Sequence, residues 1–301
     1  MRKESYITGK KIIKVVFMGI TGSFLCMILY LVLQVFFVSS FKIPSDSMRP
    51  ALEPGDCILI NKLATGSRLF NINAAFEHRP LHIYRMPGYS GFHRNDILVF
   101  NFPYPERWDS IGFNVMLYYV KRCIALPGDT LVIRNARYKV NGCNGSLGNV
   151  SSQNDLAKFL RSEDGVKEMI RRQSYYTYPG DSLLNWNISN MGPLYLPKKK
   201  DRIKIDNRNV LLYGKLIEWE QRKKLFQKGN SYYLGKEKII EYVFTKDYYF
   251  VAGDNCFNSQ DSRYWGLLPE EYIAGKASII WKSKEGYSDK WRWNRCMRRV
   301  R

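Results

Sequence analysis

The sequence predicts a mainly β domain that follows a single N-terminal transmembrane helix. Residues 15–38 contain no charged side chain. After them, short runs of β-branched, aromatic and other apolar residues recur between Pro, Gly and Asn residues, which is the pattern of strands and turns. With 45% hydrophobic residues among 301, the chain can bury a substantial core. These observations predict a membrane anchor followed by a β-rich outer domain over residues 39–301.

The apolar run 15–38 has the length of a membrane-spanning helix, for which about 20 residues suffice. Residues 1–14 carry an excess of cations, so the positive-inside rule places them in the cytoplasm and the outer domain on the opposite face. A cleaved secretory signal would have an apolar stretch of about 7 to 15 residues before a small-x-small site, and residues 38–42 make a poor site. A buried core helix is the other alternative, and the basic flank favours the anchor.

Four strands are expected in the first half of the outer domain, at residues 56–61, 96–101, 116–125 and 130–134. The Pro-Gly-Asp sequence at 127–129 predicts the turn between the last two. Further along, residues 239–245 and 248–252 lie on either side of Lys246 and Asp247 and predict a hairpin.

Two stretches, 155–172 and 209–222, have apolar residues at helical spacing with charges on the other faces. Both predict short helices, although Gly165 and Gly214 lower the helix propensity of each. The segment from about 135 to 247 is therefore interpreted as an insertion that elaborates the sheet of the outer domain.

Composition excludes several classes of protein and site. The chain has 47 Lys and Arg against 27 Asp and Glu, a formal charge of +20, which excludes an acidic disordered protein. Its six cysteines are far apart and form no C-x-x-C pair, which argues against a zinc ribbon or a dense disulfide framework. His78 and His82 have the i,i+4 spacing of helical metal ligands, but Pro80 between them would disrupt the helix. We expect no metal.

Ser45 and Ser47 share an extended segment between Pro44 and Pro50, just after the anchor. A serine hydroxyl is a weak nucleophile until a base takes its proton, and without a histidine motif lysine is the candidate base. Lys121 lies in a run made largely of apolar and aromatic residues. Burial there would lower its pKa, by up to about 3 to 5 units in the extreme, and leave a free amine. The alternative for a lysine on a strand is a solvated, charged side chain.

Three runs in this chain resemble the signature boxes of the type I signal peptidases, also called leader peptidases: IPSDSMRP at 43–50, YVKRCIALPGD at 119–129 and GDNCFNSQDSRYWG at 253–266. PGD at 54–56 and NDILVF at 95–100 also match, in the family's order. The resemblance implies a signal-peptidase-like β fold. It also implies a serine endopeptidase that removes signal peptides from exported preproteins on the outer face of a bacterial cytoplasmic membrane, without metal or organic cofactor.

By this resemblance, Ser47 is the nucleophile and Lys121 the general base, a Ser-Lys variant of the catalytic triad. Ser45 adds its hydroxyl to the backbone N–H of Ser47 as an oxyanion hole. Ser259 matches the serine that hydrogen-bonds and orients the lysine. Asp261 and Arg263 match a structural ion pair that braces the loop carrying Ser259.

The resemblance also implies shallow apolar substrate pockets, which would select small side chains such as those of an Ala-x-Ala cleavage site. The matching positions are Ile43, Met48, Leu52, Tyr119 and Val120. From the sequence alone the same residues read as ordinary core. The segment 130–250 resembles the better-known members too weakly for residues to be transferred.

One position departs from the family pattern. Asp46 lies between the two serines, where many relatives carry Gly. A carboxylate close to Lys121 would favour the ammonium form and oppose its activation, unless Asp46 faces solvent or pairs with Arg49.

The C-terminal segment brings aromatic and cationic residues together: Trp291, Arg292, Trp293, Arg295, Arg298, Arg299 and Arg301. Beside a membrane these could rest on anionic lipid headgroups, and the alternative is a solvated tail. Nucleic acid is not an expected partner, because the anchor would hold the basic domain outside the cytoplasm.

Other readings of the whole chain are an inactive or differently specific Ser-Lys relative and a basic, membrane-tethered binding protein. A Ser-Lys self-cleaving regulator would need a DNA-binding helix pair, which the sequence does not suggest. The sequence predicts no oligomeric state.

Overall fold

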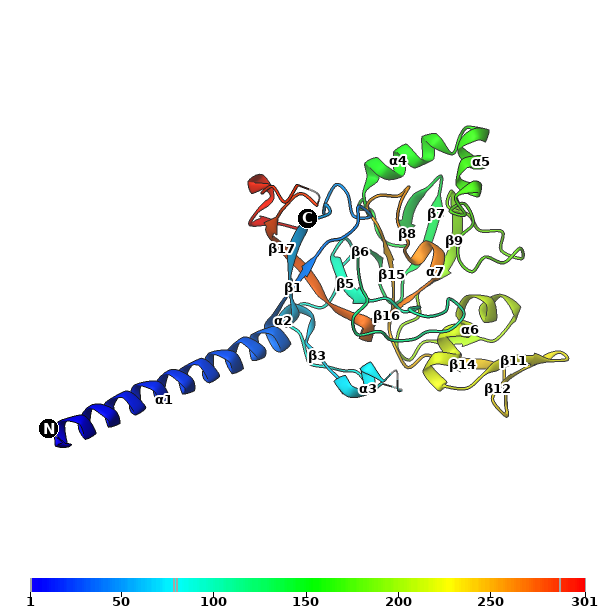
Figure 1. Cartoon of the computed structure of the whole chain (residues 1–301). Helices are drawn as coiled ribbons and strands as arrows, with labels where there is room; N and C mark the ends of the chain where they lie inside the picture. The colour runs from blue at the N-terminus through cyan, green and yellow to red at the C-terminus, as the bar shows by residue number, and fades with distance from the viewer. Residues whose placement is uncertain (1, 78, 80, 287, 301) are drawn as a thin grey trace.

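The computed structural model describes residues 2–77, 79, 81–286 and 288–300. A long helix, α1 (Arg2–Val32), continues as a π-helical turn, η1 (Leu33–Phe37), and projects away from the rest of the chain (Figure 1). Its segment Lys14–Phe37 is long and apolar enough to cross a membrane, and none of it is buried against the protein. The helix ends one residue before the predicted boundary, because Val38 already pairs with Asn61 in the sheet.

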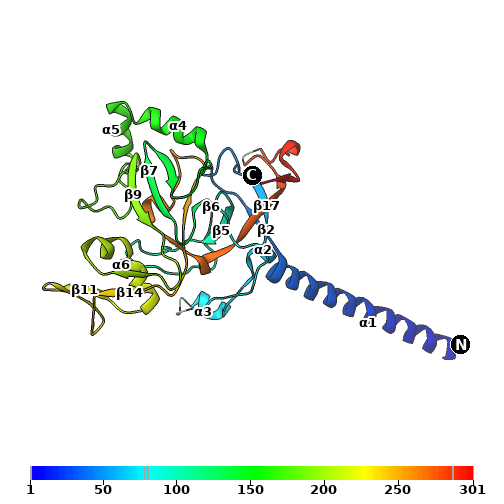
Figure 2. The ribbon, with the colours of Figure 1, turned by 180° about the vertical axis from the view of Figure 1, so that it is seen from behind.

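The domain that follows the long helix is built on one antiparallel sheet, which confirms the mainly β class (Figures 1 and 2). Its order is β1-β2-β17-β5-β6-β15-β16, with β18 paired to β17. The strands are β1 (Val38–Lys42), β2 (Asp56–Asn61), β5 (Ile97–Asn101), β6 (Tyr118–Ala125), β15 (Tyr248–Ala252), β16 (Leu268–Pro269), β17 (Ile273–Ser283) and β18 (Arg298–Arg299).

Strand β5 is buried at every position because apolar cores cover both faces of the sheet. Leu98 and Phe100 belong to one core, which also contains Trp265. Ile97 and Val99 belong to the other. This alternation follows from the two-residue period of a strand. It explains why β5 reads in the sequence as a continuous apolar run.

The segment predicted as an insertion contributes smaller sheets. One has the order β8-β7-β9, another pairs β10 with β14, and a third is the ribbon β11-β12-β13. The strands are β7 (Thr130–Arg134), β8 (Arg137–Val140), β9 (Asn190–Tyr195), β10 (Arg202–Lys204), β11 (Leu225–Lys228), β12 (Ser231–Leu234), β13 (Glu237–Ile239) and β14 (Glu241–Val243). Ile133 and Leu216 share one core with Ile124 of β6 and Phe250 of β15, so the segment packs directly on the main sheet.

The expected hairpin around Lys246 and Asp247 is wrong. β14 pairs with β10, whereas β15 pairs with β6 and β16. The physical reason is burial: β15 is buried at every position and needs neighbours inside the main sheet, whereas β14 is exposed at both ends.

The helix expected over 155–172 is two helices, α4 (Val150–Phe159) and α5 (Glu163–Arg171). The break occurs where Ser162 caps α5 by accepting a hydrogen bond from the Gly165 N–H at 3.1 Å. A Cβ at Gly165 would lie 2.0 Å from the Phe159 carbonyl oxygen, so glycine is needed for this close approach. The other expected helix is α6 (Asn207–Gln221), capped by Asp206.

Four short elements lie between β2 and β5 in the chain: α2 (Lys62–Thr65), β3 (Arg68–Leu69), α3 (Ile72–Phe76) and β4 (Tyr84–Arg85). Of these, α2 lies at the domain end of the anchor (Figure 1). The remaining short helices are α7 (Ser262–Trp265), η2 (Glu270–Tyr272) and η3 (Trp293–Arg295).

Candidate active site

Ser47 lies in the loop between β1 and β2, and its side chain is only 8% exposed. Backbone hydrogen bonds close the base of this loop, from Ile43 N–H to the Asp56 carbonyl at 2.7 Å and from Gly55 N–H to the Ile43 carbonyl at 2.8 Å. The Leu52 N–H donates to the Met48 carbonyl at 2.9 Å within it. The loop is therefore a folded turn on the sheet edge.

Lys121 lies in β6 and is 4% exposed. Its Nζ is 2.8 Å from Ser47 Oγ and donates to the Val120 carbonyl at 3.1 Å. Burial lowers the pKa of Lys121 to about 8, because its ammonium loses hydration that its protein neighbours do not replace. A lysine in this state can accept the proton of the neighbouring hydroxyl near neutral pH.

Ser45 Oγ lies 3.3 Å from Ser47 Oγ, on the exposed side of the loop. The two hydroxyls that the sequence singled out thus meet at the same point, next to the lysine.

The loop after β15 holds the Ser47 backbone from the other side. The Asn255 N–H donates to the Ser47 carbonyl at 3.0 Å. Gly253 approaches so closely that a Cβ there would lie 2.6 Å from the same carbonyl oxygen. A side chain at this position would push away the segment 43–55, which we call the Ser47 loop.

Ser259 packs against Gly253. The hydrogen bond predicted between Ser259 and Lys121 is not found among the described residues. The buried Oγ of Ser259 has no hydrogen-bond partner in the part of the chain that the structure describes. A Cβ at Gly253 would lie 2.1 Å from the Ser259 Oγ, so Ser259 packs against the glycine that itself approaches Ser47.

Asp261 and Arg263 form a buried ion pair with two parallel hydrogen bonds of 2.8 and 2.7 Å. The Asp261 carboxylate also accepts the Gly253 N–H at 2.8 Å, and Arg263 donates to the Cys256 carbonyl at 3.1 Å. Burial alone would raise the pKa of Asp261, but the charge and hydrogen bonds of Arg263 hold it below its usual value. The pair therefore ties both ends of the loop that contacts Ser47.

A second buried pair, Arg122 and Asp254, was not singled out from the sequence. Its two hydrogen bonds measure 2.7 and 2.6 Å, and Arg122 also donates to the Asn95 carbonyl at 2.9 Å. These residues directly follow Lys121 and Gly253 in the chain. The sequence did contain a signal for this pair, because the arginine and the aspartate each follow a residue of the predicted site in two of the signature runs.

The predicted pocket residues divide into two groups. Ile43, Met48 and Leu52 belong to the Ser47 loop, and their side chains are buried in the core that it shares with the sheet. Tyr119 and Val120 are half-buried beside Lys121. The Tyr119 ring stacks on Phe102 with centroids 4.5 Å apart. The roles of all five in substrate binding stay a prediction.

Asp46 is half-buried and has a partner that the sequence analysis did not consider. Its Oδ1 accepts a hydrogen bond of 3.0 Å from the Asn258 side chain. The carboxylate is thereby held toward the 253–259 loop and is not paired with Lys121.

Among the described residues, no group of three or more His, Cys, Asp and Glu side chains could hold a metal ion. His78 and Pro80, which the sequence analysis weighed, lie outside the described residues. The cysteines are all unpaired.

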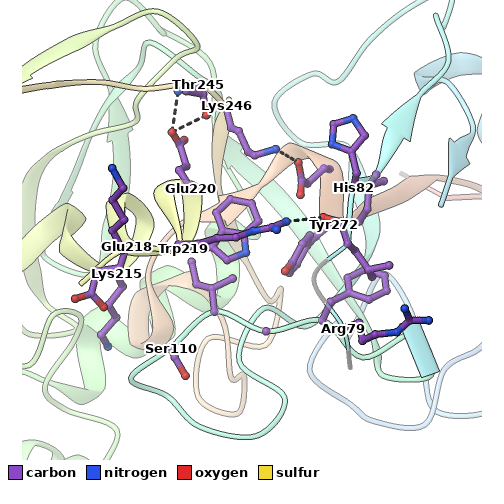
Figure 3. Close-up of a pocket in the computed structure, with 18 of the residues that line it drawn as sticks. Arg79, His82, Ser110, Lys215, Glu218, Trp219, Glu220, Thr245, Lys246 and Tyr272 are labelled. Atoms are coloured by element: carbon purple, nitrogen blue, oxygen red, sulfur yellow. Dashed lines mark hydrogen bonds and ion pairs between the residues drawn. The ribbon is translucent and has the colours of Figure 1, made fainter. Parts of the chain in front are cut away.

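A cavity of about 690 Å³ lies away from Ser47 and Lys121, between the end of α6, the 109–113 segment and η2 (Figure 3). Trp219 and Tyr272 line it, and the charged groups around it are already paired: Glu220 accepts hydrogen bonds from Thr245, and Lys246 pairs with Glu271. It contains no residue of the predicted site.

The C-terminal cluster is only partly a surface feature. Arg295 is buried and donates to Asp56 at 2.6 Å and to the Ala51 carbonyl at 3.1 Å. Arg292 donates to Glu53 at 2.7 Å and to the Pro54 carbonyl at 2.7 Å. These two arginines brace the Ser47 loop, which corrects the expectation that they face headgroups or solvent. Arg301 lies outside the described residues.

The tryptophans of the cluster are at the surface. Trp291 and Trp293 stack with centroids 4.8 Å apart, and Trp293 is 71% exposed. Lys282 and Lys284 lie over the Trp291 ring at 5.4 and 5.2 Å. Arg298 and Arg299 are also exposed.

Comparison with known proteins gives consistent matches. The sequence model of signal peptidases, peptidase S26, matches residues 17–183 and 197–282. Signal peptidase I of Buchnera aphidicola from Schizaphis graminum is 28% identical over 280 residues, which cover 92% of this chain and 78% of that protein. Signal peptidase I of Pseudomonas aeruginosa is 30% identical over 263 residues, covering 84% of this chain and 68% of that protein.

Proposed function

This chain belongs to the signal peptidase family, peptidase S26, and is a serine endopeptidase that removes signal peptides, and we propose that Ser47 and Lys121 carry out the cleavage. The observation that supports this assignment is the 2.8 Å separation between Lys121 Nζ and Ser47 Oγ inside a buried site. A serine this close to an amine of lowered pKa meets the geometric and protonation requirements of an activated nucleophile.

In the proposed reaction, the neutral amine of Lys121 accepts the hydroxyl proton as Ser47 Oγ attacks the scissile carbonyl carbon. The resulting ammonium then delivers this proton to the leaving amine as the C–N bond breaks. An ester links Ser47 to the signal peptide. Water attacks that ester with Lys121 again as the base, and the proton returns to Ser47.

The tetrahedral intermediates carry a negative oxygen that needs hydrogen-bond donors. The Ser45 hydroxyl, 3.3 Å from Ser47 Oγ, and the Ser47 backbone N–H are the proposed donors. Such preorganised donors stabilise the negative oxygen of the transition state more than they stabilise the neutral carbonyl of the substrate. They therefore lower the activation free energy.

Cleavage after small residues, as in an Ala-x-Ala site, is proposed from the apolar residues around the dyad. Ile43, Met48 and Leu52 are already packed into the core, which leaves little depth for a substrate side chain. Shallow pockets of this kind exclude large side chains by steric clash.

The anchor is proposed to cross the membrane with its basic N-terminus in the cytoplasm and the catalytic domain on the outer face, where exported preproteins emerge. Confining enzyme and substrate to one membrane raises their effective concentration without any further contact.

A contact with membrane lipids is proposed for the stacked Trp291 and Trp293 with the cations around them. Aromatic rings and lysines suit the headgroup layer, because one part of each side chain is apolar and the other polar. In vesicles with brominated phosphatidylglycerol, Trp291→Ala/Trp293→Ala should lower the quenched share of tryptophan fluorescence. Equal quenching in both proteins would remove this contact.

The decisive experiment is cleavage of a purified preprotein in detergent, with fragment masses measured for wild type, Ser47→Ala and Lys121→Met. The expected result is a cut after a small residue in wild type and at least about 10³-fold loss in both variants. An inert wild type would favour an inactive relative or a basic tethered binding protein. A Ser47→Ala protein that still cuts would exclude Ser47 as the nucleophile.

A further inference from the structure

The anchor joins the catalytic domain without a linker. Phe37 ends the π-helical turn η1, and Val38 is the first residue of β1, where it pairs with Asn61 of β2. Lys62 follows Asn61 directly and begins α2. Both views of the ribbon show α2 against the domain end of the anchor (Figures 1 and 2).

Side chains of the domain bind the last carbonyl groups of the anchor. Lys62 Nζ donates to the Gln34 carbonyl at 2.6 Å and to the Val35 carbonyl at 3.3 Å. Ser67 Oγ donates to the Phe36 carbonyl at 2.6 Å. The final carbonyls of a helix have no partner within the helix, and a cation there also meets the negative end of the helix dipole. Three consecutive carbonyls are therefore held by one cluster, which we call the anchor clamp, Lys62 and Ser67.

The anchor clamp is itself fixed to the main sheet. Ser67 is buried, and its carbonyl accepts the Met86 N–H at 2.9 Å. Arg68, the next residue, donates to the Tyr272 carbonyl at 2.9 Å, just before β17. The anchor clamp is therefore attached to the main sheet as well as to the anchor, so the anchor cannot move relative to the domain while these hydrogen bonds are kept.

The connection from the clamp to the nucleophile is also continuous. β1 is paired with β2 along its whole length, from Val38 opposite Asn61 to Lys42 opposite Cys57. The next hydrogen bond after this strand pair runs from the Ile43 N–H to the Asp56 carbonyl, at the base of the Ser47 loop. At about 3.3 Å per residue, this strand spans roughly 16 Å between the anchor and the loop.

We propose that Lys62 and Ser67 are positioning residues that lock the anchor against the catalytic domain, so that Ser47 is held at one height above the membrane. The enzyme then selects preproteins by the distance between their membrane-embedded apolar segment and their cleavage site. This inference rests on the proposed function of Ser47.

The test uses the full chain reconstituted in vesicles, with one preprotein whose spacer between apolar segment and cleavage site is shortened and lengthened residue by residue. The variant is Lys62→Met/Ser67→Ala, which removes the donors but keeps side-chain bulk. A separate variant, Lys62→Arg, keeps a cationic hydrogen-bond donor at this position. Lys238→Met is the matched control, because it removes an exposed lysine of β13, which belongs to a different sheet from β1 and β2. A short soluble peptide serves as substrate for all proteins.

Wild type and Lys238→Met should cleave a narrow range of spacer lengths. The double variant should cleave the soluble peptide at a rate within about twofold of wild type. Its preference for the best spacer over one differing by three residues should fall by roughly tenfold, the factor expected when charge-assisted hydrogen bonds no longer favour the locked joint.

An insertion of two glycines between Phe37 and Val38 gives a second way to release the joint and should flatten the length profile further. If both altered proteins cleave the peptide normally and keep the narrow wild-type profile, the positioning role is excluded. If wild type does not cleave the peptide, the proposed function itself fails, and the two outcomes are distinct.

Discussion

The amine of Lys121 lies 2.8 Å from the hydroxyl of Ser47, although 74 residues separate them in the chain. The lysine is fixed by the centre of the sheet, where it pairs with Leu98 of β5, whereas the serine is on a loop at the sheet edge. Their contact therefore depends on how the loop is held. Asn255 on one side and Arg292 and Arg295 on the other provide that support.

The activity should rise with pH through a midpoint near 8. Burial lowers the pKa of Lys121 to about 8, and only the neutral amine can accept the Ser47 proton. Below pH 7 the rate should fall about tenfold per pH unit, and above about pH 9 it should reach a plateau. The measurement is kcat/KM on a peptide from pH 6 to 10, with recovery at pH 8 as a control for stability. A midpoint above pH 10 would mean that the base is an ordinary lysine.

Lys121→Met should be inactive yet more stable than wild type at pH 7. The lysine pKa is lower in the folded than in the unfolded chain, so the unfolded chain binds more protons between about pH 8 and 10.5. The free energy of unfolding of wild type should therefore rise with pH across that window. Below it, the burial of the charged lysine destabilises the folded chain by about 3 kcal/mol. Thermal unfolding of the full chains in detergent at pH 7 and 10 measures this. A variant that melts below wild type at pH 7 would contradict it.

Gly253→Ala should lower kcat by about 10² or more. A Cβ at this position would lie 2.6 Å from the Ser47 carbonyl oxygen and 2.1 Å from Ser259 Oγ. The Ser47 loop must therefore shift. A displacement of about 1 Å from the reactive geometry has this size of effect. The matched control is Gly142→Ala, because nothing lies within 4 Å of a Cβ there, although its positive φ adds some strain. Wild-type kcat in Gly253→Ala would show that the loop tolerates the change.

Ser45→Ala should reduce kcat by about 10² to 10³ with little change in KM, because the Ser45 hydroxyl is proposed to stabilise the oxyanion and not the ground state. Ser45→Thr keeps a hydroxyl and should retain much more activity than Ser45→Ala. Steady-state kinetics on a peptide distinguishes the two parameters. Equal loss in both variants would point to packing around Ser45 and not to its hydroxyl.

Arg295→Met should destabilise the full chain by about 3 kcal/mol, because it leaves the buried carboxylate of Asp56 with weaker support. Burial alone would raise the pKa of Asp56, and the hydrogen bond from Arg295 is the main effect that holds it low. Arg298→Met, at an exposed position, should change stability by less than about 0.5 kcal/mol. Thermal unfolding compares them. Equal melting temperatures would show that the remaining donors, Arg292, Ser283 and the Glu53 N–H, suffice to hold Asp56.

Local patterns were enough for several strands and for the apolar helix, but not for the long β17 or for most strands between 135 and 239. The runs that became β2, β5, β6 and β7 were found because strand residues are apolar at short range, whatever their partners. Pairing was different: β14 and β15 are adjacent in sequence but join different sheets, since burial of β15 depends on cores that the chain forms from distant segments.

The identities of the dyad residues and of the Asp261–Arg263 pair came from runs that resemble the signal peptidases. The sequence by itself determined which groups are available, the length and polarity of the anchor, and the order of the strands. Only the tertiary structure decided which groups meet. It buried Lys121 and so lowered its pKa, it turned Asp46 to Asn258, and it used Arg292 and Arg295 as internal supports. Desolvation and ion pairing depend on contacts between segments far apart in the chain, and no local pattern contains them.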